Sequence, residues 1–193
     1  MFKDLVLKNR SYRGFDKNEK LTLEQLSEFV DCARLAASSV NMQPFKYYLS
    51  YEEKEVAAIL KNTFWAKGLP ELSLPKENEE PQAFIVIMQD KNINDNLNRF
   101  QKDVGIVAQT ILLAACEAGY GGCMIGGFVK DQIKAIMNQD ANLEPLLLIA
   151  LGKPTENIKL VDVVDNQTGY YRDENFHYVP KRALKDIIIT KKD

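Results

Sequence analysis

The sequence has little of the two residue types on which many metal and hydrolytic sites depend. It contains one histidine and three cysteines among 193 residues. Cys32, Cys116 and Cys123 are odd in number and show no CxxC spacing, which favours free thiols over disulfides or a zinc site. His177 lies between two aromatic residues, where we interpret it as a packed structural residue. We therefore expect neither a hydrolytic triad nor a metal site.

The sequence also lacks excess charge, long apolar runs and a leader-like N-terminus. A net charge of -2 at pH 7 argues against a general nucleic-acid or anionic-membrane surface. No run of about 18 uninterrupted apolar residues is present, and Asp4 makes the N-terminus a poor signal peptide. With 46% apolar and 27% charged residues, the chain is typical of globular proteins. We expect a cytoplasmic protein with no nucleic acid and no membrane as partners.

Periodicity predicts a mixture of helices and a few hydrophobic strands. Helices are predicted over residues 2–8, from Thr22 to Ala37, and over 52–61, 96–119 and 131–138. Strands are predicted over 45–51, 83–88 and 146–151, and a hairpin over 170–172 and 176–179. This mixture indicates one α+β or α/β domain over residues 1–193. Prolines mark 62–82 as a loop or lid, and 180–193 forms a C-terminal arm.

The helix predicted over 96–119 is unusual because it is apolar nearly all round from Val104 onward. A helix without a polar face is buried on all sides. In a chain of this length, a second subunit is a natural source of that cover.

Basic and polar residues gather first at Arg10, Ser11, Tyr12 and Arg13. Two guanidinium groups and a hydroxyl offer several donors to a phosphate or to the polar edge of a ring. Taken alone, the cluster is more typical of a solvated basic turn than of a ligand site.

Three later segments carry further candidate groups. Ser38, Ser39, Asn41 and Gln43 supply neutral donors and acceptors that suit an uncharged heterocycle, or they simply cap a helix. Residues 121–128 include Ile125, Gly126 and Gly127, whose backbone can approach a flat ligand closely, or they form a flexible connector. The segment contains neither a GxGxxG nor a GK[ST] motif. Lys181 and Arg182 complete a phosphate site or form a basic tail. Since no acid–base pair accompanies these groups, they suit a protein that positions a cofactor.

In this order, the segments resemble the nitroreductase family of FMN-dependent NAD(P)H oxidoreductases, in its short form and across essentially the whole chain. The family's Arg-Arg-Ser-x-Arg motif matches 9–15, and its Ala-Pro-Ser-x-x-Asn-x-Gln-Pro-Trp motif matches 36–45. The resemblance implies a three-layer α-β-α fold, with a central, mostly antiparallel sheet flanked by helices, and an intertwined homodimer. Asn9, Ala37, Val40 and Phe45 depart from the family pattern, as does the 62–82 segment with Trp65.

The resemblance also implies roles for the candidate residues. Arg10 and Ser11 would meet the FMN phosphate and ribityl chain, joined by Arg182, and Arg13 would face the pyrimidine edge. The backbone N–H near Gly126 would lie near flavin N5, so no side chain is expected to be catalytic. The partner subunit would supply, or border, Ser38, Ser39, Asn41 and Gln43. The other cofactor-binding residues would be Tyr12, Ile125, Gly127 and Lys181.

The expected enzyme passes hydride from NADH or NADPH through FMN to a nitroaromatic, quinone or similar flat acceptor. Two alternatives remain open. One is another flavin reaction on the same scaffold, such as dehalogenation or flavin destruction. The other is a non-catalytic flavin-binding or redox-sensing protein.

Overall fold

The computed structural model describes residues 1–66 and 72–190, which divide into two compact units. The first contains residues 1–65 and 74–155, and the second is built mainly from 156–190. Residues 67–71 of the predicted lid, and the last three residues of the predicted arm, lie outside the described residues. The assignment of residues 1–193 to one domain, with its lid and arm, stays a prediction.

The first unit is organised around a five-stranded sheet in which every strand pair is antiparallel. The order is β1-β5-β3-β2, and β4 also pairs with β5. The strands are β1 (Phe15–Asp16), β2 (Phe45–Ser50), β3 (Ala83–Asp90), β4 (Gly121–Ile125) and β5 (Leu143–Pro154). The long β5 is the central element because it pairs with three of the other four strands.

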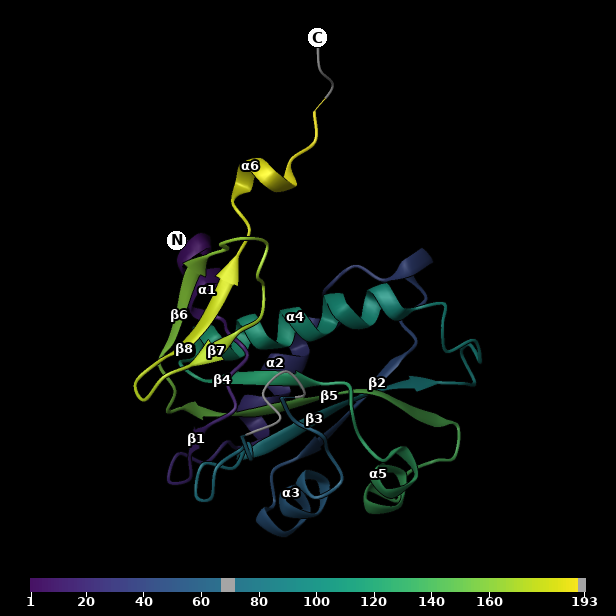
Figure 1. Cartoon of the computed structure of the whole chain (residues 1–193). Helices are drawn as coiled ribbons and strands as arrows, with labels where there is room; N and C mark the ends of the chain where they lie inside the picture. The colour runs from purple at the N-terminus through teal and green to yellow at the C-terminus, as the bar shows by residue number, and fades with distance from the viewer. Residues whose placement is uncertain (67–71, 191–193) are drawn as a thin grey trace. The chain divides into compact units, whose positions relative to one another are not determined.

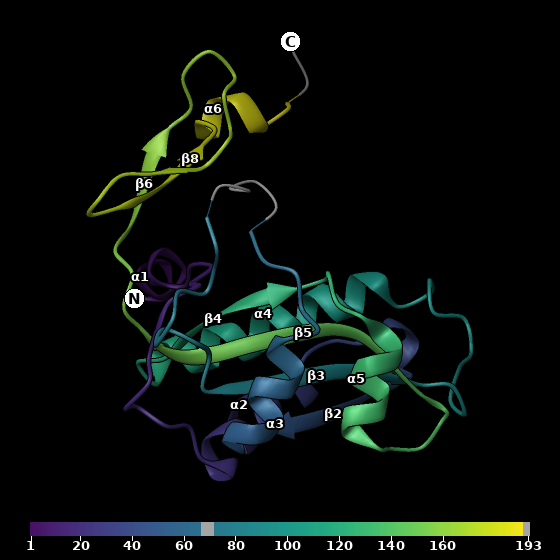
Figure 2. The same cartoon turned by 60° about the horizontal axis from the view of Figure 1, so that its bottom comes forward.

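Two pairs of helices cover the two faces of this sheet (Figures 1 and 2). The helices of the first unit are α1 (Phe2–Lys8), α2 (Leu23–Arg34), α3 (Glu53–Leu60), α4 (Gln101–Glu117) and α5 (Lys130–Met137). Helices α2 and α4 pack on one face, and α3 and α5 on the other. On β3, Ile85 and Ile87 face α2 and α4, whereas Phe84 and Val86 face α3 and α5. Both faces are apolar because both are covered, which confirms the three-layer α-β-α architecture.

A local sequence signal accounts for the start of α2. At the start of α2, the Thr22 hydroxyl accepts from the backbone N–H of Gln25 at 3.2 Å. The Gln25 side-chain oxygen accepts from the Thr22 N–H at 3.0 Å. This reciprocal capping box confirms the predicted start of the helix.

The helix predicted over 96–119 is shorter than expected, since α4 spans Gln101–Glu117. Turns precede it, in which the Asn94 side chain accepts from the Asn96 N–H and the Asn96 side chain accepts from the Asn98 N–H. Asparagine side chains compete in this way with helical backbone bonds. The local asparagine content therefore delays the start of the helix.

Gly121 and Gly122 belong to a buried strand, β4 (Gly121–Ile125), rather than to a flexible connector. A Cβ atom on Gly122 would lie 2.3 Å from the carbonyl oxygen of Ala150 on β5. Close packing of the two strands therefore requires glycine at this position.

The second unit is a three-stranded sheet formed by β6 (Ile158–Asp162), β7 (Tyr171–Arg172) and β8 (His177–Lys181), followed by α6 (Leu184–Ile187). Strands β7 and β8 pair antiparallel, which confirms the predicted hairpin, whereas β6 was not predicted. His177 is buried, and its Nδ1 accepts from Nε of Arg172 at 2.9 Å. Arg172 also pairs with Glu156. These contacts fit the interpretation of His177 as a packed structural residue.

Candidate functional site

The first predicted segment lies directly beside β4. The backbone N–H of Tyr12 donates to the carbonyl oxygen of Gly122 at 3.0 Å, and Ser11 forms a parallel bridge to Gly122. A Cβ atom on Gly121 would lie 2.6 Å from the Tyr12 ring. The fold therefore brings together two motifs that are more than a hundred residues apart in the sequence.

The side chains of this segment are partly fixed by α1. One terminal nitrogen of Arg10, Nη2, donates to the carbonyl oxygen of Val6 at 2.7 Å, and the Tyr12 hydroxyl donates to that of Lys8 at 2.8 Å. Nε of Arg10 is buried and has no hydrogen-bond partner among the described residues. A buried donor without an acceptor costs free energy. Arg10 thus keeps a donor available for an acceptor that the described residues do not provide.

The turn after β4 is open on one side and covered on the other. Gly126 is exposed, and a Cβ atom there would meet nothing within 4 Å. The carbonyl oxygen of Gly127 accepts from the Phe64 N–H at 2.8 Å, and Thr63 bridges to Phe128. The start of the predicted 62–82 lid is therefore joined to the glycine turn by backbone pairing.

Two aromatic residues in the lid segment have different environments. Trp65 packs against the core and donates from Nε1 to the Thr63 hydroxyl at 2.7 Å. Phe64 is 56% exposed, and its Cβ lies 3.3 Å from a Cβ built on Gly127. The segment thus anchors itself through Trp65 and leaves the Phe64 side chain largely in solvent beside Gly127.

The serine–amide segment forms a tight turn around a carboxylate that the sequence did not suggest. Asp103, in the first turn of α4, accepts from the Ser38 hydroxyl at 3.1 Å, the Ser39 hydroxyl at 2.6 Å and the Ser39 N–H at 2.7 Å. Burial raises the pKa of Asp103, but the hydrogen bonds from Ser39 and Ser38 outweigh this and lower it overall. The one feature of the sequence that could have indicated this role is the presence of a single acidic residue, Asp103, at the start of an apolar helix.

The two amides of this segment lie at its exposed side. Nε2 of Gln43 donates to Oδ1 of Asn41 at 3.0 Å, and the Gln43 N–H donates to the Ser38 hydroxyl at 3.1 Å. A cavity of about 160 Å³ adjoins the turn, lined by Ser38, Gln43, Tyr47 and Asp103 among others. Burial raises the pKa of Tyr47 to about 12, so its phenol stays neutral.

The predicted late cations belong to the second unit. Lys181 pairs with Asp162 of β6 in the strand register, and Arg182 donates from Nη1 to Oδ1 of Asn166 at 2.8 Å. Their part in a phosphate site stays a prediction.

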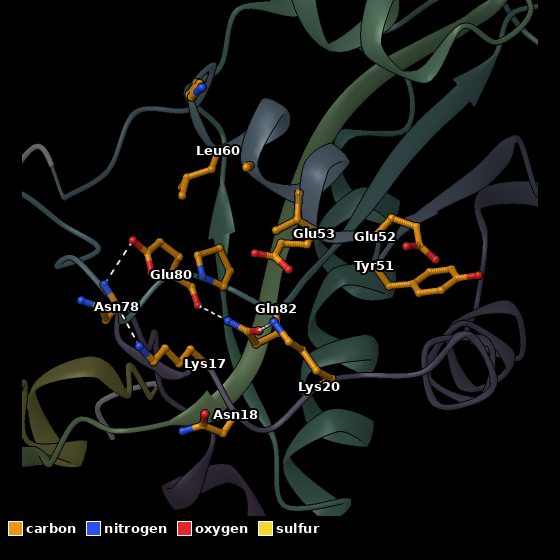
Figure 3. A pocket seen from close by; sticks show the side chains of 14 residues that line it. Lys17, Asn18, Lys20, Tyr51, Glu52, Glu53, Leu60, Asn78, Glu80 and Gln82 are labelled. Atoms are coloured by element: carbon orange, nitrogen blue, oxygen red, sulfur yellow. Dashed lines mark hydrogen bonds between the residues drawn. The ribbon is translucent and has the colours of Figure 1, made fainter.

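A larger pocket, of about 780 Å³, opens between the 17–20 loop, α3 and residues 78–82 (Figure 3). None of the predicted site residues lines it, and its lining includes three lysines and three glutamates. Lys17 donates to the Asn78 side chain at 2.9 Å, and Lys20 to the Gln82 side chain at 2.7 Å. The balanced charge, and the amide contacts of Lys17 and Lys20, do not favour an anion site here.

The described residues show neither a cluster of metal ligands nor a membrane-spanning helix. Within residues 1–66 and 72–190, no three or more His, Cys, Asp or Glu side chains come together as a metal site. Over the same ranges, no helix has the length and apolar character needed to cross a membrane.

Comparison with known proteins identifies relatives along most of the chain. The chain is 26% identical over 176 residues to the Bacillus subtilis protein named "Putative NAD(P)H nitroreductase YodC", which covers 77% of this chain and 87% of the relative. It is 25% identical over 182 residues to the oxygen-insensitive NADPH nitroreductase of Helicobacter acinonychis, with 78% and 86% covered.

Solved structures share the fold. A "putative nitroreductase in complex with FMN" from Exiguobacterium sibiricum is 22% identical, has a TM-score of 0.70, and covers 86% of this chain and 94% of its own. A nitroreductase-like protein from Streptococcus mutans is 15% identical with a TM-score of 0.73, covering 99% and 98%. The sequence profile described as the Nitroreductase family matches residues 6–153. Since that match spans well over half of the chain, the protein belongs to the nitroreductase family.

Proposed function

We propose that this protein is an FMN-dependent NAD(P)H oxidoreductase that acts as a cytoplasmic homodimer. When bound, FMN would supply the redox chemistry, taking hydride from NADH or NADPH at N5 and returning it to a nitroaromatic, quinone or similar flat acceptor. The observation that carries the proposal is the junction of the Arg10–Arg13 segment with β4 at Gly122. That junction places guanidinium donors and a glycine-rich backbone on neighbouring segments.

Two features of the site fit a bound flavin phosphate and ring. Nε of Arg10 is a buried donor with no acceptor in the described chain, and a phosphate oxygen would satisfy it. The open space at Gly126 leaves the backbone accessible to a flat ring. The FMN in the Exiguobacterium structure supports this ligand, and the names of the relatives support NAD(P)H as the electron donor.

The chain's own groups would bind and orient the cofactor. Arg10 and Ser11 would hold the phosphate and ribityl chain. Arg13 would face the pyrimidine edge, where a fixed cation stabilises the negative charge of the reduced ring. The Gly126 N–H would hydrogen-bond at N5, and Tyr12, Ile125 and Gly127 would border the ring. No side chain is assigned to proton transfer, which water can perform.

A second subunit would complete each site. Ile106 on α4 is 43% exposed in the single chain, beside buried residues of the same helix. Burial of such a face against a second copy would give α4 the cover that its apolar sequence requires. In that arrangement Ser38, Ser39, Asn41 and Gln43 would come from the partner or border it.

The exposed phenylalanine beside the glycine turn fits the acceptor side of this site. A flat acceptor at N5 would lie next to Gly127, which Phe64 contacts. Aromatic side chains pair favourably with flat rings. Phe64 is therefore our candidate for an aromatic wall of the acceptor pocket.

The decisive experiment is an anaerobic titration of purified, FMN-reconstituted protein with NADH and with NADPH, followed by an acceptor screen. We expect a yellow protein that is bleached by at least one nicotinamide and turns over with nitroaromatics or quinones. A colourless protein that FMN cannot reconstitute would overturn the proposal. Bound FMN with negligible turnover would favour a redox-sensing protein. Slow bleaching with an unrelated acceptor would favour another flavin reaction.

A further inference from the structure

One buried carboxylate outside the predicted site holds the turn that the serine–amide residues form. Asp103 is only 2% exposed and accepts hydrogen bonds from three donors of Ser38 and Ser39. A buried charge is stable only when it is paired or fully hydrogen-bonded, and these donors meet that need. The location of Asp103 in the first turn of α4 adds a favourable helix dipole.

The turn that Asp103 holds has an unfavourable backbone conformation. Val40, Asn41 and Gln43 all have positive φ values, of 49°, 53° and 49°. Asparagine tolerates this region, but a β-branched valine there is an outlier. Such conformations persist only where the surroundings enforce them, and they gather at functional sites. The contacts to Asp103 lie immediately before the strained residues in the chain.

A chain of hydrogen bonds connects the Asp103 carboxylate to the side-chain amides of Gln43 and Asn41. The Ser38 hydroxyl donates to Asp103 and accepts from the Gln43 N–H at 3.1 Å, and the Gln43 side chain in turn donates to Asn41. The hydroxyl hydrogens of both serines are therefore directed to the carboxylate. This leaves the amides of Asn41 and Gln43 as the groups on the exposed side of the turn.

We infer that Asp103 is a positioning residue: through Ser38 and Ser39 it fixes the strained 38–43 turn so that Asn41 and Gln43 meet the cofactor. Ser38 and Ser39 then serve the site through Asp103 rather than by direct contact with the ring. This inference rests on the proposed function, because the turn is assigned there to FMN binding.

The test compares Asp103→Asn with Asp131→Asn, an exposed aspartate in the first turn of α5. Two quantities are measured: the FMN dissociation constant, and hydrogen exchange of the 38–43 amides without FMN. We expect Asp103→Asn to weaken FMN binding about tenfold or more and to speed exchange in the turn by a similar factor. Asp131→Asn should change neither. Faster global unfolding with an unchanged FMN constant would reduce Asp103 to a structural role and overturn the inference.

Ser39 variants keep the inference testable if Asp103→Asn does not fold. Ser39→Ala should weaken FMN binding, and Ser39→Thr, which keeps the hydroxyl, should restore it. If Asp103→Asn does fold, a double-mutant cycle adds a further test, in which Ser39→Ala should have little additional effect in the Asp103→Asn background. Fully additive effects would mean that Ser39 contacts the cofactor directly, which contradicts the inference.

Failure of this inference can be told apart from failure of the proposed function. If the wild-type protein binds no FMN, the proposed function fails. The exchange rates of the 38–43 amides still report whether Asp103 holds the turn. Unchanged exchange in both Asp103→Asn and Ser39→Ala would overturn the inference whatever the cofactor result.

Discussion

The backbone N–H of Tyr12 donates to the carbonyl oxygen of Gly122 at 3.0 Å. This bond joins the segment after the first helix to a strand in the second half of the first unit. The two segments carry the cationic and the glycine-rich parts of the candidate site. The close approach depends on glycine, because side chains at positions 121 and 122 would collide with Tyr12 and with β5.

Replacing Gly122 with alanine should destabilise the fold. The new Cβ would lie 2.3 Å from the Ala150 carbonyl oxygen and within 2.9 Å of two leucine side chains. Overpacking of this kind costs about 1–3 kcal/mol, and a backbone oxygen has little room to move. Urea unfolding measures the change in the free energy of unfolding. Gly169→Ala is the control, because nothing lies within 4 Å of a Cβ built on Gly169. Equal stability of the two variants would contradict the packing argument.

Replacing Arg13 with alanine should lower both the affinity for FMN and the reduction potential of the bound flavin. Loss of a charge-assisted contact should weaken binding by about tenfold. Arg13→Lys should retain part of the effect on the potential, because it keeps the charge but not the planar fork. Potentiometry against a reference dye gives the shift, with Lys17→Ala as a cation control from the pocket of Figure 3. An unchanged potential with FMN still bound would refute the placement of Arg13.

Replacing Phe64 with alanine should raise KM for aromatic acceptors by about three- to tenfold, the value of one aromatic pair. The FMN dissociation constant and turnover with ferricyanide, a non-aromatic acceptor, should stay unchanged. Phe64→Tyr should behave like the wild type. Phe2→Ala is the matched control, since Phe2 is an exposed phenylalanine on α1. An identical rise in KM for ferricyanide would argue against stacking at Phe64.

Replacing Ile106 with aspartate (Ile106→Asp) should dissociate the proposed homodimer. An aspartate buried between two copies of α4 lacks a partner, and we expect the dimer dissociation constant to rise by roughly 100-fold. Light scattering over a concentration series measures it. Ile93→Asp provides the control, because Ile93 is similarly exposed at 41% but lies in a turn outside α4. A wild-type protein that is already monomeric at high concentration would refute the dimer itself.

Acid should destabilise the protein partly through Asp103 and Glu144. Burial raises the pKa of Glu144, but hydrogen bonds and charge from Lys130 and Lys134 lower it overall, as the serines do for Asp103. A carboxyl with a lowered folded-state pKa stabilises the protein above its unfolded pKa of about 4, and this contribution fades as the pH falls further. Urea unfolding between pH 7 and 3 should show a smaller acid-induced loss for Glu144→Gln and for Asp103→Asn than for the wild type. If both variants lost as much stability in acid as the wild type, Asp103 and Glu144 would not contribute to the acid-induced destabilisation.

Local patterns in the sequence predicted most of the first unit's elements. The capping box at Thr22 and the continuous apolar run at 83–88 are short-range signals, and the structure has the helix and the strand where they predict them. Four motifs in one chain order also indicated the family. Each of these signals depends on neighbouring residues and so can be recognised without knowing what packs against them.

Other features depended on contacts between distant segments. The strand at 121–125 forms because β5 pairs along it, although its glycines are also typical of a turn. The carboxylate that holds Ser38 and Ser39 comes from Asp103, more than sixty residues away. The sequence by itself thus determined most of the helices, the buried strands at 83–88 and 146–151, and the family. Only the tertiary structure decided which backbone lies beside Arg10 and what the serine hydroxyls bind, because hydrogen-bond partners across a sheet or between helices are chosen by packing.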